Sequence, residues 1–292
     1  MIPYYSFIPR KVPVFSGAVL MTILKTKKKE YLLDCSLGKG DAFVTIRKTR
    51  DTIYIGDAPF SITEIKNLVK NTRRVYVLEN NELHPLAIIE NNNLYQLVLF
   101  ESCRTPTVEI SGIHMHRVLI DPLFDDAKRK ILALNPKPGR LVLEVCTGLG
   151  YTTYWLIKKK CRIMATIEKS RAILQLAEYN PWSLHLKDTP IVLGDATKLI
   201  HEFDTYSVDY IVHDPPRYSI APELYSGSFY DELCRVLRPK GKLLHYVGRP
   251  GEKRGKRFIK GILERLRNAG FTKVTLLKEI QCVTATKPLH LF

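Results

Sequence analysis

The sequence predicts an α/β protein with a mostly parallel sheet covered by helices on both faces, preceded by a smaller α+β or β-rich domain. From Leu141 onward, short apolar runs such as LVLEV, RIMATIE and PIVLG alternate with helical stretches. This alternation is typical of a doubly wound parallel sheet. The residues before 107 contain strands and turns without that rhythm. We therefore expect two domains, at 1–106 and 107–292.

The smaller domain is predicted from turn and cap signals. YLLDCSL and AFVTI flank Gly38-Lys39-Gly40-Asp41, which is typical of a hairpin. Ser61 and Glu64 have the spacing of a capping box, so a short helix is expected over ITEIKNLVKN. The strands RRVYVLE, PLAIIE and LYQLVLFE follow, separated by asparagine-rich turns. We expect this domain to position a substrate.

The larger domain begins in the sequence with the strands TVEI and IHMHRVLI. A helix is then expected over PLFDDAKRKILALN, where Pro122 suits a first turn. After the first βα units, VDYIVHD is the fourth strand, and helices are expected over Phe229–Leu237 and Phe258–Ala269 around the strand KLLHYVG. The last strands, KVTLLKEI and QCVTATK, are too closely joined for a crossover, so one of them is expected to be antiparallel.

The composition narrows the class of protein. Lys and Arg number 45 and Asp and Glu 29, a net charge of +16, which favours a polyanionic partner over a generally lysine-rich surface. The apolar stretch Gly17–Leu24 is far shorter than the roughly 20 residues that a membrane helix needs. The amino-terminal residues lack the pattern of a secretory signal. The cysteines form no CxxC pair, so we expect reduced thiols in a cytoplasmic protein.

The strongest local signal is LVLEVCTGLGYTT, an apolar strand that runs through Glu144 into Gly148 and Gly150 and then a helix. Glycine in such a turn lets backbone approach a ligand closely, and the helix start offers free N–H groups. Two acids follow later strands, Glu168 after RIMATI and Asp195 after PIVLG. The first can accept ribose hydroxyl protons and the second an adenine amino group. For each acid alone, a helix cap or solvated loop residue is the alternative.

Over roughly Pro122 to Lys287 the chain resembles the Rossmann-like S-adenosylmethionine-dependent methyltransferases. The resemblance implies a seven-stranded sheet with a reversed final hairpin, S-adenosylmethionine as cofactor, S-adenosylhomocysteine as product and no metal. It implies that Glu168 binds ribose, that Asp195 contacts adenine, and that Glu144 and the glycine turn hold the methionine portion. Cys146 departs from the usual first glycine. The cofactor residues so implied are Glu144, Cys146, Thr147, Gly148, Gly150, Tyr151, Glu168, Lys169, Asp195 and Ala196.

The fourth strand runs directly into Asp214, Pro215, Pro216 and Arg217. These resemble the (Asp/Asn/Ser)-Pro-Pro-aromatic motif of methyltransferases that act on exocyclic base amines. Such an amine is a poor nucleophile because its lone pair is delocalised into the ring. A carboxylate and a carbonyl of the rigid proline pair can accept its N–H bonds and direct the lone pair at a methyl group. Arg217 replaces the aromatic residue; it can stack on a base or hold phosphate, and Tyr218 can stack instead. A rigid loop after a buried strand is the alternative.

Positive charge is concentrated in one segment, because Arg235–Arg267 carries twelve Lys or Arg and two acids. Its centre, GRPGEKRGKR, follows the strand KLLHYVG at the edge where the pocket is expected. This favours a loop that binds RNA phosphates over a solvated basic surface. The RNA-binding residues so predicted are Arg249, Lys253, Arg254, Lys256 and Arg257.

His114 and His116 lie on one face of a possible strand, where two histidines can bind a metal. No third ligand is evident, so we expect packing, a cofactor lid or an RNA contact instead. Arg117 and Asp121 are considered as residues that help to close the cofactor pocket.

TVEISGIHMHR, LEVCTGLGY and HDPPR together resemble a family of predicted archaeal methyltransferases. The resemblance implies cytidine N4 of ribosomal RNA as the target, in a flipped or single-stranded base. RNA is thus the expected partner, no membrane partner is expected, and the sequence does not indicate the oligomeric state. A small-molecule N-methyltransferase or an aminopropyltransferase is the first alternative; the second enzyme must bind a polycation, so the basic charge disfavours it unless acids crowd Asp214. The second alternative is an RNA-binding module with a degenerate methyltransferase fold. The presence of Glu168, Asp195 and Asp214 disfavours this alternative.

Overall fold

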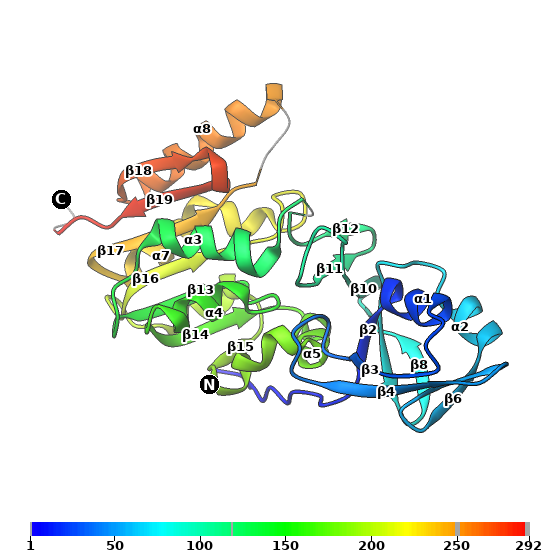
Figure 1. The fold of residues 1–292 in the computed structure, drawn as a ribbon. Coiled ribbons are helices and arrows are strands. Elements are labelled where there is room, and N and C mark those ends of the chain that lie inside the picture. The colour runs from blue at the N-terminus through cyan, green and yellow to red at the C-terminus, as the bar shows by residue number, and fades with distance from the viewer. Residues whose placement is uncertain (1, 118, 249–251, 290–292) are drawn as a thin grey trace. The chain divides into compact units, whose positions relative to one another are not determined.

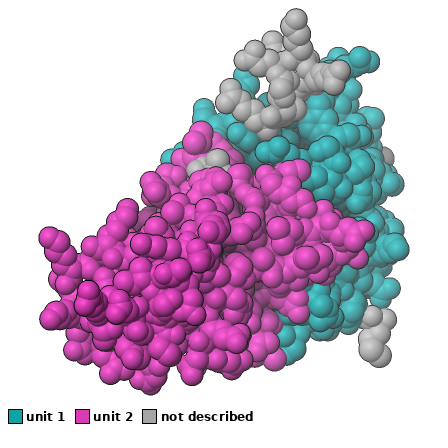
Figure 2. Space-filling model, turned by 90° about the vertical axis from the view of Figure 1, so that its right-hand side faces the viewer, with its two compact units in different colours: residues 1–7, 123–171, 185–292 teal, residues 8–122, 172–184 magenta. Residues whose placement is uncertain are grey.

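The computed structural model describes residues 2–117, 119–248 and 252–289, with only the backbone described for 252–256. The chain forms two compact units, coloured separately in Figure 2. Residues 1–7, 123–171 and 185–292 make up the first, and residues 8–122 and 172–184 the second. No helix in the described part of the chain is long and apolar enough to cross a membrane.

The division between the units differs from the expected boundary at residue 106. Strands β11 (Thr107–Ile110) and β12 (Ile113–His114) belong to the second unit, because β11 pairs with β10 (Asn93–Val98) and β12 pairs with β11. The ladder holds the chain in the second unit to His114, and hydrogen bonds from Arg104 and Thr105 to the Asp121 carboxylate hold the segment that ends at Pro122. The first unit resumes at Leu123. Strand pairing and the hydrogen bonds of Asp121 therefore place residues 107–122 in the second unit, although the sequence rhythm changes earlier.

The first unit is built on one sheet with the strand order β1-β15-β14-β13-β16-β17-β19-β18. Strands β13 to β17 pair in parallel, and β19 runs antiparallel to both of its neighbours, as the prediction for the last two strands required. The strands are β13 (Leu141–Val145), β14 (Arg162–Glu168), β15 (Ile191–Leu193), β16 (Val208–His213), β17 (Leu237–Tyr246), β18 (Thr272–Leu277) and β19 (Cys282–Thr286).

An eighth strand lies at the edge of this sheet. Strand β1 (Tyr4–Tyr5) pairs antiparallel with β15, with Tyr4 opposite Val192 and Tyr5 opposite Ile191. The seven strands implied by the resemblance are thus present, and the amino terminus adds one more. Two residues are too few to show an alternating pattern, so the sequence did not indicate this strand.

Helices cover both faces of the sheet, as Figure 1 shows, which confirms the predicted fold class. Neighbouring residues of a strand point to opposite faces. Val142 accordingly packs in a core with Ile131 of α3 and Leu156 of α4, whereas Leu143 packs in a second core with Leu233 of α7 and Ile262 of α8. The helices and short helical turns are η1 (Pro122–Ala127), α3 (Lys128–Leu134), α4 (Tyr151–Lys158), η2 (Pro181–Asp188), α6 (Ala196–Leu199), η3 (Ile200–Glu202), η4 (Pro222–Tyr225), α7 (Gly227–Val236), α8 (Glu252–Asn268) and η5 (Lys278–Ile280).

The second unit combines small antiparallel sheets with short helices, as expected for an α+β or β-rich domain. The predicted hairpin joins β3 to β4, and the predicted capping box starts α2, where Ser61 Oγ accepts from Glu64 N at 3.1 Å. The sheets have the orders β2-β7-β8, β3-β4-β5-β6 and β12-β11-β10-β9. The remaining elements are β2 (Val14–Ser16), α1 (Gly17–Lys25), β3 (Glu30–Asp34), β4 (Phe43–Lys48), β5 (Thr52–Ile55), β6 (Ala58–Ser61), α2 (Ile62–Leu68), β7 (Val75–Glu79), β8 (Glu82–Pro85), β9 (Ala87–Glu90) and α5 (Arg171–Tyr179).

Gly150 connects the glycine turn to α4 and is tightly packed. It has a φ of 74°, and a Cβ there would lie 2.7 Å from Leu186 Cδ2. Gly139 has a similar φ of 75°, with nothing within 4 Å of an added Cβ.

We expect Gly139→Ala to lower the free energy of unfolding by about 1 kcal/mol from backbone strain. Gly150→Ala should cost about 1–3 kcal/mol more, because overpacking adds to that strain. Urea unfolding of both variants measures the difference, and equal losses would contradict the close packing.

Candidate active site

The predicted cofactor residues and the Asp-Pro-Pro motif meet at one edge of the sheet in the first unit. They follow or end β15, β14, β13 and β16, which are neighbours in that order. Val145, at the end of β13, pairs with Ile167 on one side and with His213 on the other, so these strand ends are level. Ligands of open α/β sheets bind at this carboxyl edge.

The glycine turn after β13 is anchored on the neighbouring strand. The N–H groups of Cys146 and Thr147 both donate to the Ile167 carbonyl, at 2.9 and 3.1 Å. Cys146 has a φ of 71°, in the left-handed region that glycine adopts more readily. The turn therefore keeps a glycine-like backbone at Cys146, at a cost of about 1–2 kcal/mol. Burial raises the pKa of the Cys146 thiol well above its usual value, with Glu168 and Asp214 adding to the shift, so the thiol stays protonated.

Glu168 ends β14 and holds the turn with its side chain. Its carboxylate accepts from Gly148 N at 2.9 Å and from Ser170 N at 3.0 Å. The residue is 7% exposed. The acid predicted to bind ribose is thus placed between the glycine turn and the start of α5, with its orientation set by backbone donors.

Glu144 lies beneath the turn and is fully buried. Its carboxylate accepts hydrogen bonds from the hydroxyls of Thr152, Thr153 and Thr166. Burial raises the pKa of Glu144 to about 7 even though these hydroxyls oppose the shift. The carboxylate thus ties β13 to α4 and β14, and its contact with a methionine portion stays a prediction.

Asp195 caps a helix and also carries a charge at the site edge. Its Oδ1 accepts from Thr197 N at 3.0 Å, and its Oδ2 accepts from Lys169 Nζ at 2.9 Å. Burial acts to raise the pKa of Asp195, but the hydrogen bonds from Lys169 and Thr197 outweigh it and lower the pKa. The helix-cap interpretation is therefore realised, at the position predicted for adenine recognition. Ala196 follows at the start of α6, and Tyr151 is buried at the start of α4.

Asp214 is held by a buried lysine that the sequence reasoning missed. Lys130 Nζ, on α3, donates to Asp214 Oδ1 and Oδ2 at 3.0 and 2.8 Å and pairs with Asp126 Oδ2 at 2.8 Å. Burial acts to lower the pKa of Lys130, but Asp214 and Asp126 together raise it well above its usual value. Burial raises the pKa of Asp214, against the effect of Lys130. A signal existed, because Lys130 follows Asp126 by four residues on the apolar face that includes Ile131 and Leu134.

Two hydrogen bonds hold the loop around Asp214 in place. Tyr225 donates to the Pro216 carbonyl at 2.8 Å, and Asp214 N donates to the Val145 carbonyl at 3.1 Å. The ring of Tyr218, 48% exposed, lies edge to face against Phe258 of α8 at 5.1 Å between centroids. Pro215 is buried and Arg217 is exposed. The predicted stacking residue Tyr218 thus has an aromatic partner that the sequence reasoning also missed.

A buried histidine pair supports this loop. His213 Nε2 donates to the Leu224 carbonyl at 2.9 Å, and its ring stacks on His245 with centroids 4.4 Å apart. Tyr230 donates to His245 Nε2 at 2.9 Å. Burial lowers the pKa of His213 to about 4 and that of His245 well below its usual value. Both rings are therefore neutral and act through packing and hydrogen bonds.

The predicted RNA-binding residues are only partly described. Arg249 lies outside the described residues, and the side chains of Lys253, Arg254 and Lys256 are also outside the description. Arg257 is exposed on α8. The expected basic loop is partly helical, since α8 begins at Glu252 and not at Phe258. The first turns of this helix carry only polar residues and glycine, so they gave no apolar period in the sequence.

The residues considered in IHMHR and just beyond belong to the second unit. His114 Nε2 lies 2.8 Å from Glu109 Oε2, and His116 Nδ1 lies 2.8 Å from Thr107 Oγ1. Asp121 accepts from Thr105 N and Oγ1, and Arg117 is half-buried. In the described ranges no three or more His, Cys, Asp or Glu side chains lie together as metal ligands would.

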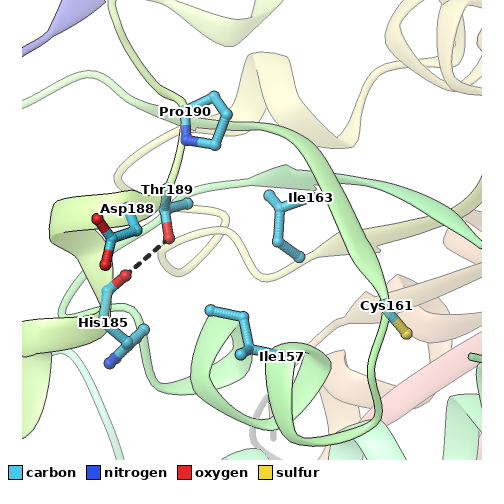
Figure 3. Close-up of a pocket in the computed structure, with 7 residues that line it drawn as sticks. All are labelled: Ile157, Cys161, Ile163, His185, Asp188, Thr189 and Pro190. Atoms are coloured by element: carbon cyan, nitrogen blue, oxygen red, sulfur yellow. Dashed lines mark hydrogen bonds between the residues drawn. The ribbon is translucent and has the colours of Figure 1, made fainter. Parts of the chain in front are cut away.

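A pocket of the first unit lies elsewhere, where α4 ends and β14 begins (Figure 3). It is lined by Ile157, Cys161, Ile163, His185, Asp188, Thr189 and Pro190. Inside it Thr189 Oγ1 donates to the His185 carbonyl at 3.0 Å, and the His185 ring contacts the Gly150 carbonyl at 2.7 Å. The pocket contains none of the predicted site residues and is separate from the carboxyl edge.

The strand order, the glycine turn and the acids at the carboxyl edge define the first unit as a Rossmann-like methyltransferase fold. Over 280 residues the chain is 40% identical to the uncharacterized protein MJ1233 of Methanocaldococcus jannaschii, covering 94% of this chain and 95% of that protein. The chain therefore belongs to the same family as MJ1233. No protein-family model matches the chain.

Two solved spermidine synthases share the fold at 13% identity. One, in complex with the transition-state analogue AdoDATO, has a TM-score of 0.54 and covers 99% of this chain and 84% of its own. The other, from Thermotoga maritima, has a TM-score of 0.51 and covers 91% of this chain and 81% of its own. The likeness therefore includes both compact units.

The raised pKa of Glu144 makes stability depend on pH. Between its usual value of 4.5 and about 7, the unfolded chain releases this proton while the folded chain keeps it. The free energy of unfolding therefore falls as pH rises through this window, by about 3 kcal/mol from this group. Glu144→Gln has no such proton, so the stability of wild type relative to the variant should fall by that amount. Urea unfolding from about pH 5 to about pH 8 measures it. The exposed Asp204→Asn is the control, and parallel curves for wild type and Glu144→Gln would contradict the shift.

Proposed function

We propose that the protein is an S-adenosylmethionine-dependent methyltransferase that acts on an exocyclic base amine of RNA, with cytidine N4 of ribosomal RNA as its target. The observation that carries the proposal is the position of Asp214-Pro215-Pro216. The motif begins directly at the end of β16, beside the glycine turn that follows β13. A reacting amine bound by this motif would lie next to a cofactor bound at the turn.

The residues at the carboxyl edge fit S-adenosylmethionine. The turn from Cys146 to Gly150 brings backbone close to the edge, Glu168 is oriented by two backbone donors, and Asp195 is an anion at the next strand end. Carboxylates at these positions suit ribose hydroxyls and an adenine amino group. The bound cofactor supplies an electrophilic methyl group on sulfur.

The chain itself orients the amine. Asp214 accepts one N–H bond, and a carbonyl of the Pro215-Pro216 pair accepts the other; the Pro216 carbonyl is held in place by the hydrogen bond from Tyr225 and keeps a second lone pair. Two acceptors turn the nitrogen lone pair out of the ring and toward the methyl group. The cofactor, when bound, would give its methyl group to this nitrogen and keep the bonding pair on sulfur, and Asp214, which accepts the N–H bond, would take the proton that the nitrogen loses. Tyr218 and Phe258 offer aromatic faces for the base.

An aminopropyltransferase is the second candidate, because spermidine synthases align with 99% and 91% of the chain. Such an enzyme binds a cationic amine and needs uncompensated acids. Asp126 does lie near Asp214, but Lys130 pairs with both carboxylates. This internal ammonium and the net charge of +16 favour a neutral amine on a polyanion.

The first test is transfer of labelled methyl from S-adenosylmethionine to RNA that lacks the modification made by this protein, followed by nucleoside mass spectrometry. We expect N4-methylated cytidine. Label in another nucleoside would support an RNA methyltransferase but contradict cytidine as the target base. Label in no RNA, naked or in ribosomal particles, would overturn the RNA substrate. Asp214→Ala should abolish transfer, a loss of at least about 100-fold, and leave cofactor binding by calorimetry within about threefold.

The basic segment of α8 is expected to contact RNA phosphates. The variant with Lys253, Arg254, Lys256 and Arg257 replaced by Ala should reduce the slope of log K against log salt by up to about 3, at roughly 0.7 per lost single-strand contact. A variant with the same charge change in the second unit, at the exposed Lys27, Lys28, Lys29 and Arg50, is the matched control. Filter binding to target RNA at several salt concentrations measures both slopes. Equal slopes in the two variants would remove α8 from the interface.

A further inference from the structure

We infer that Lys130 is a specificity-determining residue: its ammonium fills a two-carboxylate cation site made by Asp126 and Asp214, so that the pocket accepts a neutral amine and rejects a cationic one. The effect on the acceptor rests on the proposed function, whereas the filled cation site follows from the structure alone. The two parts can therefore fail separately.

The geometry is that of a filled ammonium site. Lys130 Nζ lies 2.8 Å from Asp126 Oδ2, 2.8 Å from Asp214 Oδ2 and 3.0 Å from Asp214 Oδ1. The Tyr246 ring centroid lies 4.3 Å from the same nitrogen, close enough for a cation–π contact. Two carboxylates and one aromatic face thus surround the ammonium, which is how proteins also hold small cationic amines.

Among the three charged side chains of this cluster, Asp214 is the most exposed. The side chains of Lys130 and Asp126 are 4% and 3% exposed, whereas that of Asp214 is 18% exposed. A ligand amine at the carboxyl edge therefore meets Asp214 first, with the ammonium of Lys130 behind it. Asp214 keeps oxygen lone pairs for a neutral N–H donor, since a carboxylate accepts about four hydrogen bonds.

The charges next to Asp214 have opposite effects on it. Lys130 lowers the pKa of Asp214, whereas the neighbouring Asp126 carboxylate raises it. Without Lys130, Asp126 and Asp214 would lose the ammonium that both of them bind, and Asp214 would keep a like charge beside it. A buried carboxylate in that position favours a proton or another cation.

Lys130 is held in place by the helical segment η1 and by α3. Asp126, in η1, precedes it by four residues and pairs with it at 2.8 Å. Ile131 and Leu134 fix α3 against the sheet. The ammonium is therefore positioned before any substrate binds, and a cationic acceptor would have to displace it or lie beside it in a buried site.

The test uses Lys130→Ala, which removes the ammonium and leaves space for a small one. We expect methylammonium chloride, near a hundred times its dissociation constant, to raise the Tm of this variant by about 5–10 °C relative to sodium chloride. Wild type and Lys128→Ala, a variant of an exposed lysine on the same helix, should shift by less than about 1 °C. Equal shifts in all three proteins would overturn the cation site, and this readout needs neither RNA nor methyl transfer.

A second readout separates positioning from folding. Transfer to RNA by Lys130→Ala should fall at least about tenfold in kcat and recover with added methylammonium but not with tetramethylammonium, which cannot donate hydrogen bonds. Calorimetry with 1,4-diaminobutane should show binding at least about tenfold tighter in Lys130→Ala than in wild type. Unchanged diamine affinity would overturn the specificity role even if the Tm shift is observed.

If Lys130→Ala does not fold in sodium chloride, it is prepared in methylammonium chloride. Folding there and loss of fold on dialysis would support the filled site. If it folds in neither salt, Lys130→Ala with Asp126→Asn replaces it, because a single carboxylate then remains beside the space. Methylammonium should still raise the Tm of this double variant more than that of wild type, and no such difference would overturn the proposal.

Discussion

The level ends of β14, β13 and β16 are the constraint on which the site depends. Val145 is paired on both sides, and the turn that follows it hangs from the Ile167 carbonyl by two N–H groups. The Glu168 carboxylate accepts a hydrogen bond from Gly148 N, and Asp214 N donates one to the Val145 carbonyl. A change of register in β13 would therefore move the glycine turn, the acid beside it and the Asp-Pro-Pro motif together.

Two buried charges beneath this edge are satisfied in different ways. The three threonine hydroxyls around Glu144 lower its pKa, but burial outweighs them and raises the pKa to about 7, so the carboxyl is about half protonated near pH 7. An ammonium lies between Asp126 and Asp214, so opposite charge prevails and Lys130 stays protonated. The first arrangement fastens β13 to its neighbours, and the second sets the charge of the surface that an acceptor meets.

The likeness to spermidine synthases concerns the fold, whereas the proposed action on RNA concerns the side chains of the site. A shared fold at 13% identity describes how strands and helices are connected, and unrelated functions occur on one fold. The acceptor is decided by side chains at the edge. There Lys130 pairs with Asp214, and Tyr218 lies against Phe258; these contacts are the basis on which we propose a neutral planar base and not a polyamine.

Local order in the sequence determined the mostly parallel sheet, the reversed last hairpin, and the positions of Gly148, Glu168, Asp195 and Asp214 after successive strands. These features could be predicted because the carboxyl ends of neighbouring parallel strands meet at one edge. Only the tertiary structure decided the eighth strand, the unit boundary at Pro122, the helical start of α8 and the pairing of Lys130 with Asp214. Each of these depends on a contact between distant segments or on a polar stretch without a period. Residue spacing indicates that Lys130 follows Asp126 by four residues on an apolar face, but it does not indicate that Lys130 meets Asp214, because packing alone brings those groups together.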